Sequence, residues 1–280
     1  MKTVGYFNGK VGELDELYVP FNERTHFFGD GVYDATSAGN HIPFALDDHI
    51  DRFYNSAGYI DIKIDMTKGE MAALLRDLTT KLDSPQSQVY WQITRGTANR
   101  NHVFPDAPNN FWVMIRPFPK PNFAKREKAI TYPDRRFQYC YVKTLNLLPN
   151  CLASEAAKQA GCEEAIFCRG ERVTECSHSN VHILKNGMLQ TAPTDELILP
   201  GIARKHLIEQ CKALGVPVSE TPFTVAEMMN ADEVIVSSAS TFGIALSHIN
   251  GKPVGGKAPE LLAKLQDAVF HEFLAETKQL

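Results

Sequence analysis

Lys143 interrupts a stretch, "FQYCYVK" (137–143), whose apolar and aromatic residues alternate in the manner of a β-strand. Tyr139 and Tyr141 fall on one face of this predicted strand, and Lys143 shares their phase. A lysine in apolar surroundings loses hydration, which favours the neutral amine, and the neutral amine is the form that condenses with carbonyl groups. The pattern therefore indicates a nucleophile for a carbonyl carbon. A lysine on an edge strand that extends to water would fit the same pattern.

Three features elsewhere in the chain supply what a lysine nucleophile needs beside pyridoxal phosphate (PLP). Glu175, in "RVTECSHSN" at the end of a predicted strand, is placed to keep a pyridine-ring nitrogen protonated, as PLP requires to act as an electron sink. "LPGIAR" (199–204) puts a glycine at a predicted helix start, where free N–H groups and the helix dipole suit a phosphate. Hydroxyl groups end a predicted buried strand in "VSSAS" (236–240), and Arg52 adds a cation. Lysine, acid and phosphate seat together indicate a PLP site, although each alone is common.

Strand and helix patterns are mixed in both halves of the chain, which indicates an α/β or α+β fold. The elements predicted in the first half are a hairpin at Asn8-Gly9, helices over 46–58 and from the capping box of Thr67 and Glu70 to Leu78, and strands over 88–96 and 111–118. Those predicted in the second half are the strand with Lys143, helices over 151–161, 200–215 and 259–275, hairpins turning at Arg169-Gly170 and Asn186-Gly187, and a buried strand within 232–240.

The stretch 117–128 is rich in proline and cations and has little periodicity, so we interpret it as a linker. It divides the chain into a small N-terminal α/β domain (1–118) and a large C-terminal domain that binds PLP (119–280).

Composition excludes several classes of partner. The formal net charge of -4 argues against a nucleic-acid binder. No apolar run approaches the length of a membrane span, and "MKTVGYFNGK" lacks the apolar core of a signal peptide. The 6 cysteines form no C-x-x-C pair, a usage typical of thiols in a reducing compartment. We therefore expect a cytoplasmic protein without nucleic-acid or membrane partners.

Nearly the whole chain resembles the PLP enzymes of fold type IV, which include D-amino-acid transaminase, branched-chain aminotransferase and aminodeoxychorismate lyase. The motifs that carry the resemblance are "FGDGVYD" (28–34), "HIDRFYNSA" (49–57), "TRGTANRNHVFP" (94–105), "VKTLNLLPN" (142–150), "GCEEAIF" (161–167), "VTECSHSN" (173–180), "LPGIAR" (199–204) and "ADEVIVSS" (231–238). The resemblance implies a smaller N-terminal and a larger C-terminal domain with PLP at their interface.

The same resemblance implies roles for single residues. Lys143 would form a Schiff base with PLP, the internal aldimine, and move a proton between the substrate Cα and the cofactor C4′. Glu175 would pair with the ring nitrogen. The predicted phosphate ligands are Arg52, Ser240 and the backbone at Ile202 and Ala203. The predicted cofactor-binding set is completed by Ser177, Ser238 and Ala239.

Substrate choice is expected to depend on Tyr33, Arg100 and His102, because D-amino-acid transaminases combine a tyrosine in G-D-G-V-Y with R-x-H after T-R-G. Such donors can clamp a carboxylate. The resemblance therefore implies transfer of amino groups from D-amino acids to 2-oxo acids, by a ping-pong reaction. It also implies a homodimer, because in the family this loop reaches the neighbouring subunit's site. His178 replaces a residue that is usually small and is predicted to contact substrate.

Several alternatives stay open at this point. "VTEC" also resembles the lyase, which releases pyruvate to form 4-aminobenzoate, and a branched-chain L-amino-acid aminotransferase would share the same lysine. A non-enzymatic binding module would make Lys143 structural. His178 and His182 are four apart, but on a strand they share no helical face, so we expect no metal. Motifs of the usual hydrolases, dinucleotide binders and NTPases are missing.

Overall fold

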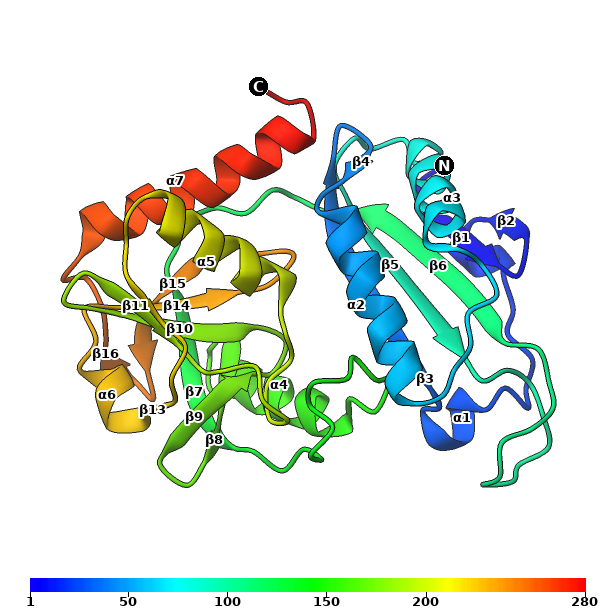
Figure 1. Ribbon diagram of the computed structural model, residues 1–280, viewed down its shortest axis with the longest axis horizontal. Helices are drawn as coiled ribbons and strands as arrows, with labels where there is room; N and C mark the ends of the chain where they lie inside the picture. The colour runs from blue at the N-terminus through cyan, green and yellow to red at the C-terminus, as the bar shows by residue number, and fades with distance from the viewer. The chain divides into compact units, whose positions relative to one another are not determined.

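The computed structural model describes residues 1–280 and has a mixed α+β fold with seven α-helices and two β-sheets (Figure 1). The chain forms two compact units. The first unit comprises Met1–Lys120, Val142–Asn146 and Phe273–Leu280, and the second comprises Pro121–Tyr141 and Leu147–Glu272. The predicted domains, 1–118 and 119–280, stay a prediction. The compact units differ from them in assigning the Lys143 segment and the C-terminal residues to the first unit.

The first unit is built on an antiparallel sheet with the strand order β2-β1-β6-β5-β3-β4. Its strands are β1 (Val4–Phe7), β2 (Lys10–Gly12), β3 (Gly31–Gly39), β4 (Ile42–Pro43), β5 (Ser87–Thr94) and β6 (Asn110–Pro117). Its helical elements are the 3₁₀-helix η1 (Leu14–Glu16) and the α-helices α1 (Thr25–Phe28), α2 (Leu46–Tyr59) and α3 (Lys68–Thr80). The hairpin at Asn8-Gly9, both strands predicted in the middle of this unit and both helices are confirmed.

The helices α2 and α3 pack on each other and against this sheet (Figure 1). Alternate residues of β5 face the core, and the ring of Trp91 meets the ring of Phe53 from α2 edge to face, with 6.1 Å between centroids. The apolar face of α2 is buried at Ile50 and Phe53. His49 and Arg52 are buried on the same helix, which its periodicity did not predict. Two polar side chains are therefore enclosed in this unit and need partners there.

The second unit contains a sheet with the strand order β12-β11-β10-β14-β15-β7-β8-β9-β13, and β16 pairs with β15. Its strands are β7 (Glu127–Pro133), β8 (Glu164–Arg169), β9 (Arg172–Cys176), β10 (Asn180–Lys185), β11 (Met188–Thr191), β12 (Val218–Ser219), β13 (Phe223–Thr224), β14 (Glu233–Ser237), β15 (Ile244–Ile249) and β16 (Lys252–Pro253). Its helices are α4 (Leu148–Gln159), α5 (Ile202–Ala213), α6 (Val225–Met229) and α7 (Pro259–Glu276), the last of which ends in residues of the first unit.

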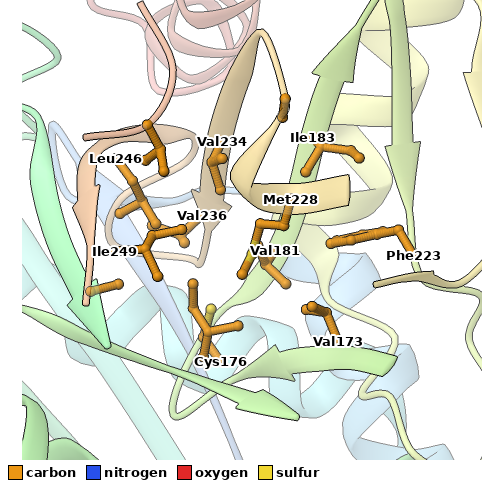
Figure 2. Packing of buried hydrophobic residues seen from close by; sticks show 14 of the residues in the cluster. Val173, Cys176, Val181, Ile183, Phe223, Met228, Val234, Val236, Leu246 and Ile249 are labelled. Atoms are coloured by element: carbon orange, nitrogen blue, oxygen red, sulfur yellow. The ribbon is translucent and has the colours of Figure 1, made fainter. Parts of the chain in front are cut away.

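Apolar side chains from several of these strands form one core cluster, which Figure 2 shows. The side chains from β10 and β14 alternate into it, and α6 closes it with Met228. The hairpins predicted at Arg169-Gly170 and Asn186-Gly187 are confirmed, and so are the three helices of this half. α4 begins at Leu148, three residues before the predicted start, with Pro149 in its first turn, where a missing N–H costs little.

The predicted strand around Lys143 is wrong. Residues 134–147 contain turns and extended backbone, and their single β contact is an isolated bridge between Thr144 and Val32. Tyr139 is 61% exposed and Val142 is buried, as on the two faces of a strand, but no neighbouring strand pairs with this stretch. Lys143 therefore lies on a loop that is fixed by tertiary contacts.

None of the seven helices combines the length and the hydropathy that crossing a membrane requires.

Candidate active site

The backbone of Lys143 is fastened to the beginning of β3 in the first unit. Its N–H donates to Ser56 Oγ at 3.2 Å, and its carbonyl accepts from the Tyr33 N–H at 3.0 Å. Gly31 makes the close approach of this loop possible, since a Cβ there would lie 2.8 Å from Leu145 Cδ1. The Lys143 Nζ lies 4.4 Å from the centroid of the Tyr33 ring, a cation–π distance. The structure thus brings together two residues that were predicted for catalysis and substrate binding.

Arg52 forms a buried ion pair with Asp34, a residue that the sequence reasoning did not single out. Arg52 Nε lies 2.9 Å from Asp34 Oδ2, Arg52 Nη2 lies 2.7 Å from Oδ1, and His49 Nδ1 lies 2.8 Å from Oδ1. Burial by itself would raise the pKa of Asp34, but Arg52 and His49 outweigh it and hold that pKa well below its usual value. Burial lowers the pKa of His49 despite Asp34, so its ring is neutral at neutral pH. The role of Arg52 as a phosphate ligand stays a prediction.

The loop between β5 and β6 carries Arg100 and His102 together beside Phe28. The guanidinium carbon of Arg100 lies 5.3 Å from the Phe28 ring centroid, and the His102 ring lies 5.2 Å from it between centroids. Arg100 is exposed and pairs with no carboxylate in the structure. A cation without an acid partner is able to receive a carboxylate from solution.

Glu175, at the end of β9 in the second unit, is held by donors on both carboxylate oxygens. Its Oε1 accepts from Arg136 Nη1, and its Oε2 accepts from Asn180 Nδ2 at 3.0 Å and from the Leu199 N–H at 3.0 Å. The residue is 5% exposed. Buried charged groups in proteins are normally paired in this way, so the contacts fix both the charge and the direction of the carboxylate.

Arg136 and Asp134 were missed by the sequence reasoning. Arg136 Nη2 and Asp134 Oδ2 are 2.9 Å apart, and the guanidinium carbon of Arg136 lies 4.5 Å from the centroid of the Phe167 ring. Arg169 also donates to Asp134, at 3.1 Å. Burial lowers the pKa of Arg136, but Asp134 and Glu175 outweigh this and raise it overall. The available signal was the charged run Asp134-Arg135-Arg136 directly before the stretch that was predicted as a strand, a pattern that is equally typical of a solvated loop.

The N-terminus of α5 offers unpaired backbone donors at Ile202 and Ala203, as predicted from "LPGIAR". Its N-cap is Gly201, which makes no side-chain cap, and the first N–H groups of a helix lack partners within it. Asn180 lies against this turn, because a Cβ on Gly201 would lie 1.9 Å from Asn180 Oδ1. Asn180 is also paired with Ser237 across β10 and β14. The helix start, the Glu175 carboxylate and the end of β14 therefore meet at Asn180.

A turn rich in hydroxyl groups follows β14. Ser238 Oγ lies 3.1 Å from Ser240 Oγ and 2.9 Å from Thr241 Oγ1, and the Phe242 N–H donates to the Ser238 carbonyl at 2.8 Å. Thr241 was not predicted, although it belongs to the same hydroxyl run. Ala239 lies in this turn between the two serines.

Ser177 and His178 are held by Glu164, a buried residue of β8. Ser177 Oγ donates to Glu164 Oε1, and His178 Nδ1 lies 3.1 Å from Glu164 Oε2. The contact of His178 with substrate stays a prediction. His182 makes a different contact, with its Nε2 2.7 Å from Ser237 Oγ, and burial lowers the pKa of His182 to about 3.

Comparison with known proteins identifies the family. Residues 31–249 match the family described as amino-transferase class IV. The chain belongs to the class IV aminotransferases. A D-alanine aminotransferase from Listeria monocytogenes is 39% identical over 280 residues, covering 98% of this chain and 97% of that protein. A D-alanine aminotransferase from Bacillus licheniformis is 36% identical over 276 residues, covering 97% of each chain.

Solved structures of this class share the fold. The branched-chain amino acid aminotransferase from Escherichia coli superposes with a TM-score of 0.88 at 21% identity, covering 99% of this chain and 96% of that one. A fold IV transaminase from Curtobacterium pusillum superposes with a TM-score of 0.81 at 17% identity, covering 93% of each. The predicted fold type is thereby confirmed.

Class IV aminotransferases depend on PLP, and the donors present in this chain fit that cofactor. Lys143 supplies an amine, Glu175 supplies a carboxylate fixed by three donors, and α5 with the serine turn supplies N–H and O–H donors for a phosphate dianion. Gly201 leaves the helix start open, where any larger residue would meet Asn180.

We expect Gly201→Ala to lower the stability of the protein and its affinity for PLP. The new methyl group collides with Asn180 Oδ1, and an overpacked site of this kind costs about 1–3 kcal/mol. Asn180 must then shift away from Glu175 or from the α5 turn. Urea unfolding and PLP titration by absorbance measure the two effects. Gly69→Ala is the matched control, because a Cβ at Gly69 has no atom within 4 Å. An equal loss in both variants would contradict the role of Gly201.

Proposed function

We propose that this aminotransferase moves amino groups from D-amino acids to 2-oxo acids. The observation that carries the proposal is the loop with Arg100 and His102, whose cation has no acid partner in the protein. The relatives at 34–40% identity that cover nearly the whole chain, among them those named above, are D-alanine aminotransferases. Both observations support a binding site for the carboxylate of a D-amino acid.

Bound PLP supplies an electron sink for the electron pair that is left when the substrate Cα loses its proton. In the proposed mechanism Lys143 Nζ accepts that proton and returns it later, and its loop attachment to Ser56 and Tyr33 limits where the amine can lie. The carboxylate of Glu175 would stabilise the protonated form of the PLP ring nitrogen. The start of α5, the hydroxyl turn and Arg52 would hold the phosphate, and Tyr33, Arg100 and His102 would hold the substrate carboxylate. Ser177 and His178 would line the site from the side of Glu164.

A branched-chain L-amino-acid aminotransferase is the second candidate, and it rests only on solved structures at 21–22% identity, which establish the fold alone. The lyase that releases pyruvate from aminodeoxychorismate is the third, on the resemblance of "VTEC". Because Lys143 has a fixed position, the place where the substrate carboxylate is held distinguishes a D-amino-acid aminotransferase from a branched-chain L-amino-acid aminotransferase. If Arg100 holds the carboxylate, the D-enantiomer directs its Cα hydrogen to Lys143. If a pocket near the phosphate holds the carboxylate, the L-enantiomer directs its Cα hydrogen to Lys143.

We also propose a homodimer that works in a reducing compartment, the cytoplasm. The apolar side chains of Val103 and Phe21, which are 73% and 91% exposed, favour contact with a second copy. All six cysteines are free. Light scattering of the purified protein tests the dimer, and a monomer at micromolar concentration would contradict it.

We expect Arg100→Ala to weaken D-alanine binding by roughly ten- to a hundred-fold, because a lost hydrogen bond to a charged group costs about 1.5–3 kcal/mol. PLP binding should be unchanged, since Arg100 contacts none of the residues proposed for the phosphate. Half-reaction spectroscopy on the PLP-loaded protein with D-alanine and with L-alanine measures affinity and handedness together. Lys63→Ala, an exposed lysine of the same unit, is the control. Preference of the wild type for L-alanine, or undiminished D-alanine affinity in Arg100→Ala, would sink the D-specific proposal and leave the family assignment in place.

A further inference from the structure

The loop that carries Arg100 and His102 has no regular secondary structure, so its course must be fixed from outside. It connects β5 to β6, and its only ladder contact is the isolated bridge between Thr97 and Glu23. Two exposed donor side chains on an unsupported loop would lose conformational freedom whenever they bind a ligand, which weakens binding. The surroundings of this loop contain a support that the proposed carboxylate site does not include.

Arg24 contacts the loop at Asn101, the residue that lies between Arg100 and His102. Its Nη1 donates to the Asn101 carbonyl at 2.6 Å, and its backbone N–H donates to the Gly96 carbonyl at 3.1 Å. The guanidinium carbon of Arg24 also lies 4.9 Å from the Phe28 ring centroid, the same ring that Arg100 and His102 approach. Arg24 is 2% exposed and so is not available to a substrate itself.

Arg95 supports the far side of the same loop. Its guanidinium carbon lies 3.4 Å from the centroid of the Phe104 ring, and its Nη1 and Nη2 donate to the backbone carbonyls of Asp61 and Ile60 at 2.9 and 2.6 Å. Asp30 joins the two arginines, because its carboxylate accepts from Arg24 Nε at 2.8 Å and from Arg95 Nε at 3.0 Å. One acid thus fixes two cations that hold the loop at Asn101 and at Phe104.

The arginines around this loop have two different roles. Arg24 and Arg95 are buried and share the carboxylate of Asp30, whereas Arg100 is exposed and has no acid partner. The guanidinium groups of the buried arginines donate hydrogen bonds to protein carbonyls and to Asp30, so they cannot compete for a substrate carboxylate. Their contacts fix the backbone from which Arg100 and His102 project.

We infer that Arg24 and Arg95, joined by Asp30, are positioning residues that preorganise Arg100 and His102 for the substrate carboxylate. This inference rests on the proposed function. A ligand carboxylate then meets two donors whose backbone is already ordered, which lowers the entropic cost of binding. Loosening the support should therefore weaken substrate binding without removing any group that touches substrate or cofactor.

The experiment compares PLP-loaded wild type with Arg24→Gln, Arg24→Lys and Arg116→Gln in the half-reaction with D-alanine. We expect Arg24→Gln to raise the apparent Kd for D-alanine about ten-fold, with little change in the rate at saturation and in PLP absorbance. Arg24→Lys should also bind D-alanine more weakly than the wild type, because one amine cannot reach both Asp30 and the Asn101 carbonyl as the guanidinium group does. Arg116, an exposed arginine of β6 that contacts Gln88, is the matched control and should leave the Kd unchanged.

A triple variant separates positioning from general stability. If Arg24 acts through Arg100 and His102, then Arg24→Gln added to the pair Arg100→Ala and His102→Ala should weaken D-alanine binding by less than about two-fold beyond that pair alone. A purely structural Arg24 would lower the melting temperature and leave the Kd alone. Should Arg24→Gln not fold, Arg24→Lys gives the deciding Kd, because it keeps a cation beside Asp30.

The outcomes also separate this inference from the proposed function. A folded Arg24 variant with the wild-type Kd, while Arg100→Ala weakens binding, would overturn the inference and leave the proposed function standing. Undiminished affinity in Arg100→Ala would overturn the proposed function, and the inference with it.

Discussion

Lys143→Ala should lose multiple turnover, with the rate falling by at least about 10²–10⁴-fold, the usual contribution of a positioned acid–base group. The substitution removes both the amine that binds the cofactor covalently and the group that carries the Cα proton. No neighbour can replace it, because His49 is buried beside Asp34 and Arg52 is held in the same ion pair. Steady-state transamination of D-alanine measures the loss.

A covalent label gives a second readout that does not depend on activity. After borohydride treatment the wild-type protein should carry the cofactor on the peptide that contains Lys143, and the variant should carry none. Lys68→Ala is the control, since the amine of this exposed lysine of α3 lies 2.8 Å from Asp51 and 5.7 Å from the centroid of the Tyr54 ring, and neither of these is a residue proposed for the site. Label on another lysine, or near-normal turnover by Lys143→Ala, would refute the assignment of Lys143.

Glu175→Gln should keep the fold and lower the rate of the half-reaction by about 10²–10³-fold, the range found when one preorganised charge-stabilising group is removed. A neutral amide cannot stabilise a protonated ring nitrogen. The structure adds a second cost, because both carboxylate oxygens of Glu175 accept from donors. The amide nitrogen of a glutamine would have to oppose Arg136 on one side, or Asn180 and Leu199 on the other.

Single-turnover spectroscopy separates this chemical effect from a loss of structure, and thermal unfolding reports the stability of the same samples. Glu171→Gln, in the exposed turn between β8 and β9, is the matched control and should react as the wild type does. An unchanged half-reaction rate in Glu175→Gln would show that another acid serves the ring nitrogen.

The local elements could be predicted because their signals are local. Asn8-Gly9 forms its hairpin because both residues adopt positive φ, 45° and 96°, which few other pairs tolerate. The capping box of Thr67 and Glu70 satisfies the first N–H groups of α3 whatever the helix packs against. The stretch around Lys143 was misassigned for the opposite reason. Its backbone partners, Ser56 and Tyr33, lie far away in the sequence, and alternation alone cannot reveal them.

The residues proposed for chemistry could be chosen from residue type and motif order, but the residues that support them could not. Lys143 and Glu175 lie in motifs that resemble a known family, and so do Arg100 and His102. Arg136, which fixes Glu175, and Arg24, which holds the Asn101 carbonyl, are single arginines in segments without a motif. An arginine is usually solvated, and only the tertiary structure shows that its donors are used by particular carbonyls and carboxylates.

By itself the sequence determined most helices, the hairpins and the fold type, and it named the residues proposed for chemistry, since these follow from periodicity, turn residues and motif order. Only the tertiary structure decided that Lys143 lies on a loop fastened to β3, that Asp34 occupies two nitrogens of Arg52, and that Asp30 joins Arg24 to Arg95. The physical reason is that a buried charge must find a partner, and the partner is chosen by the folded backbone and not by distance along the chain.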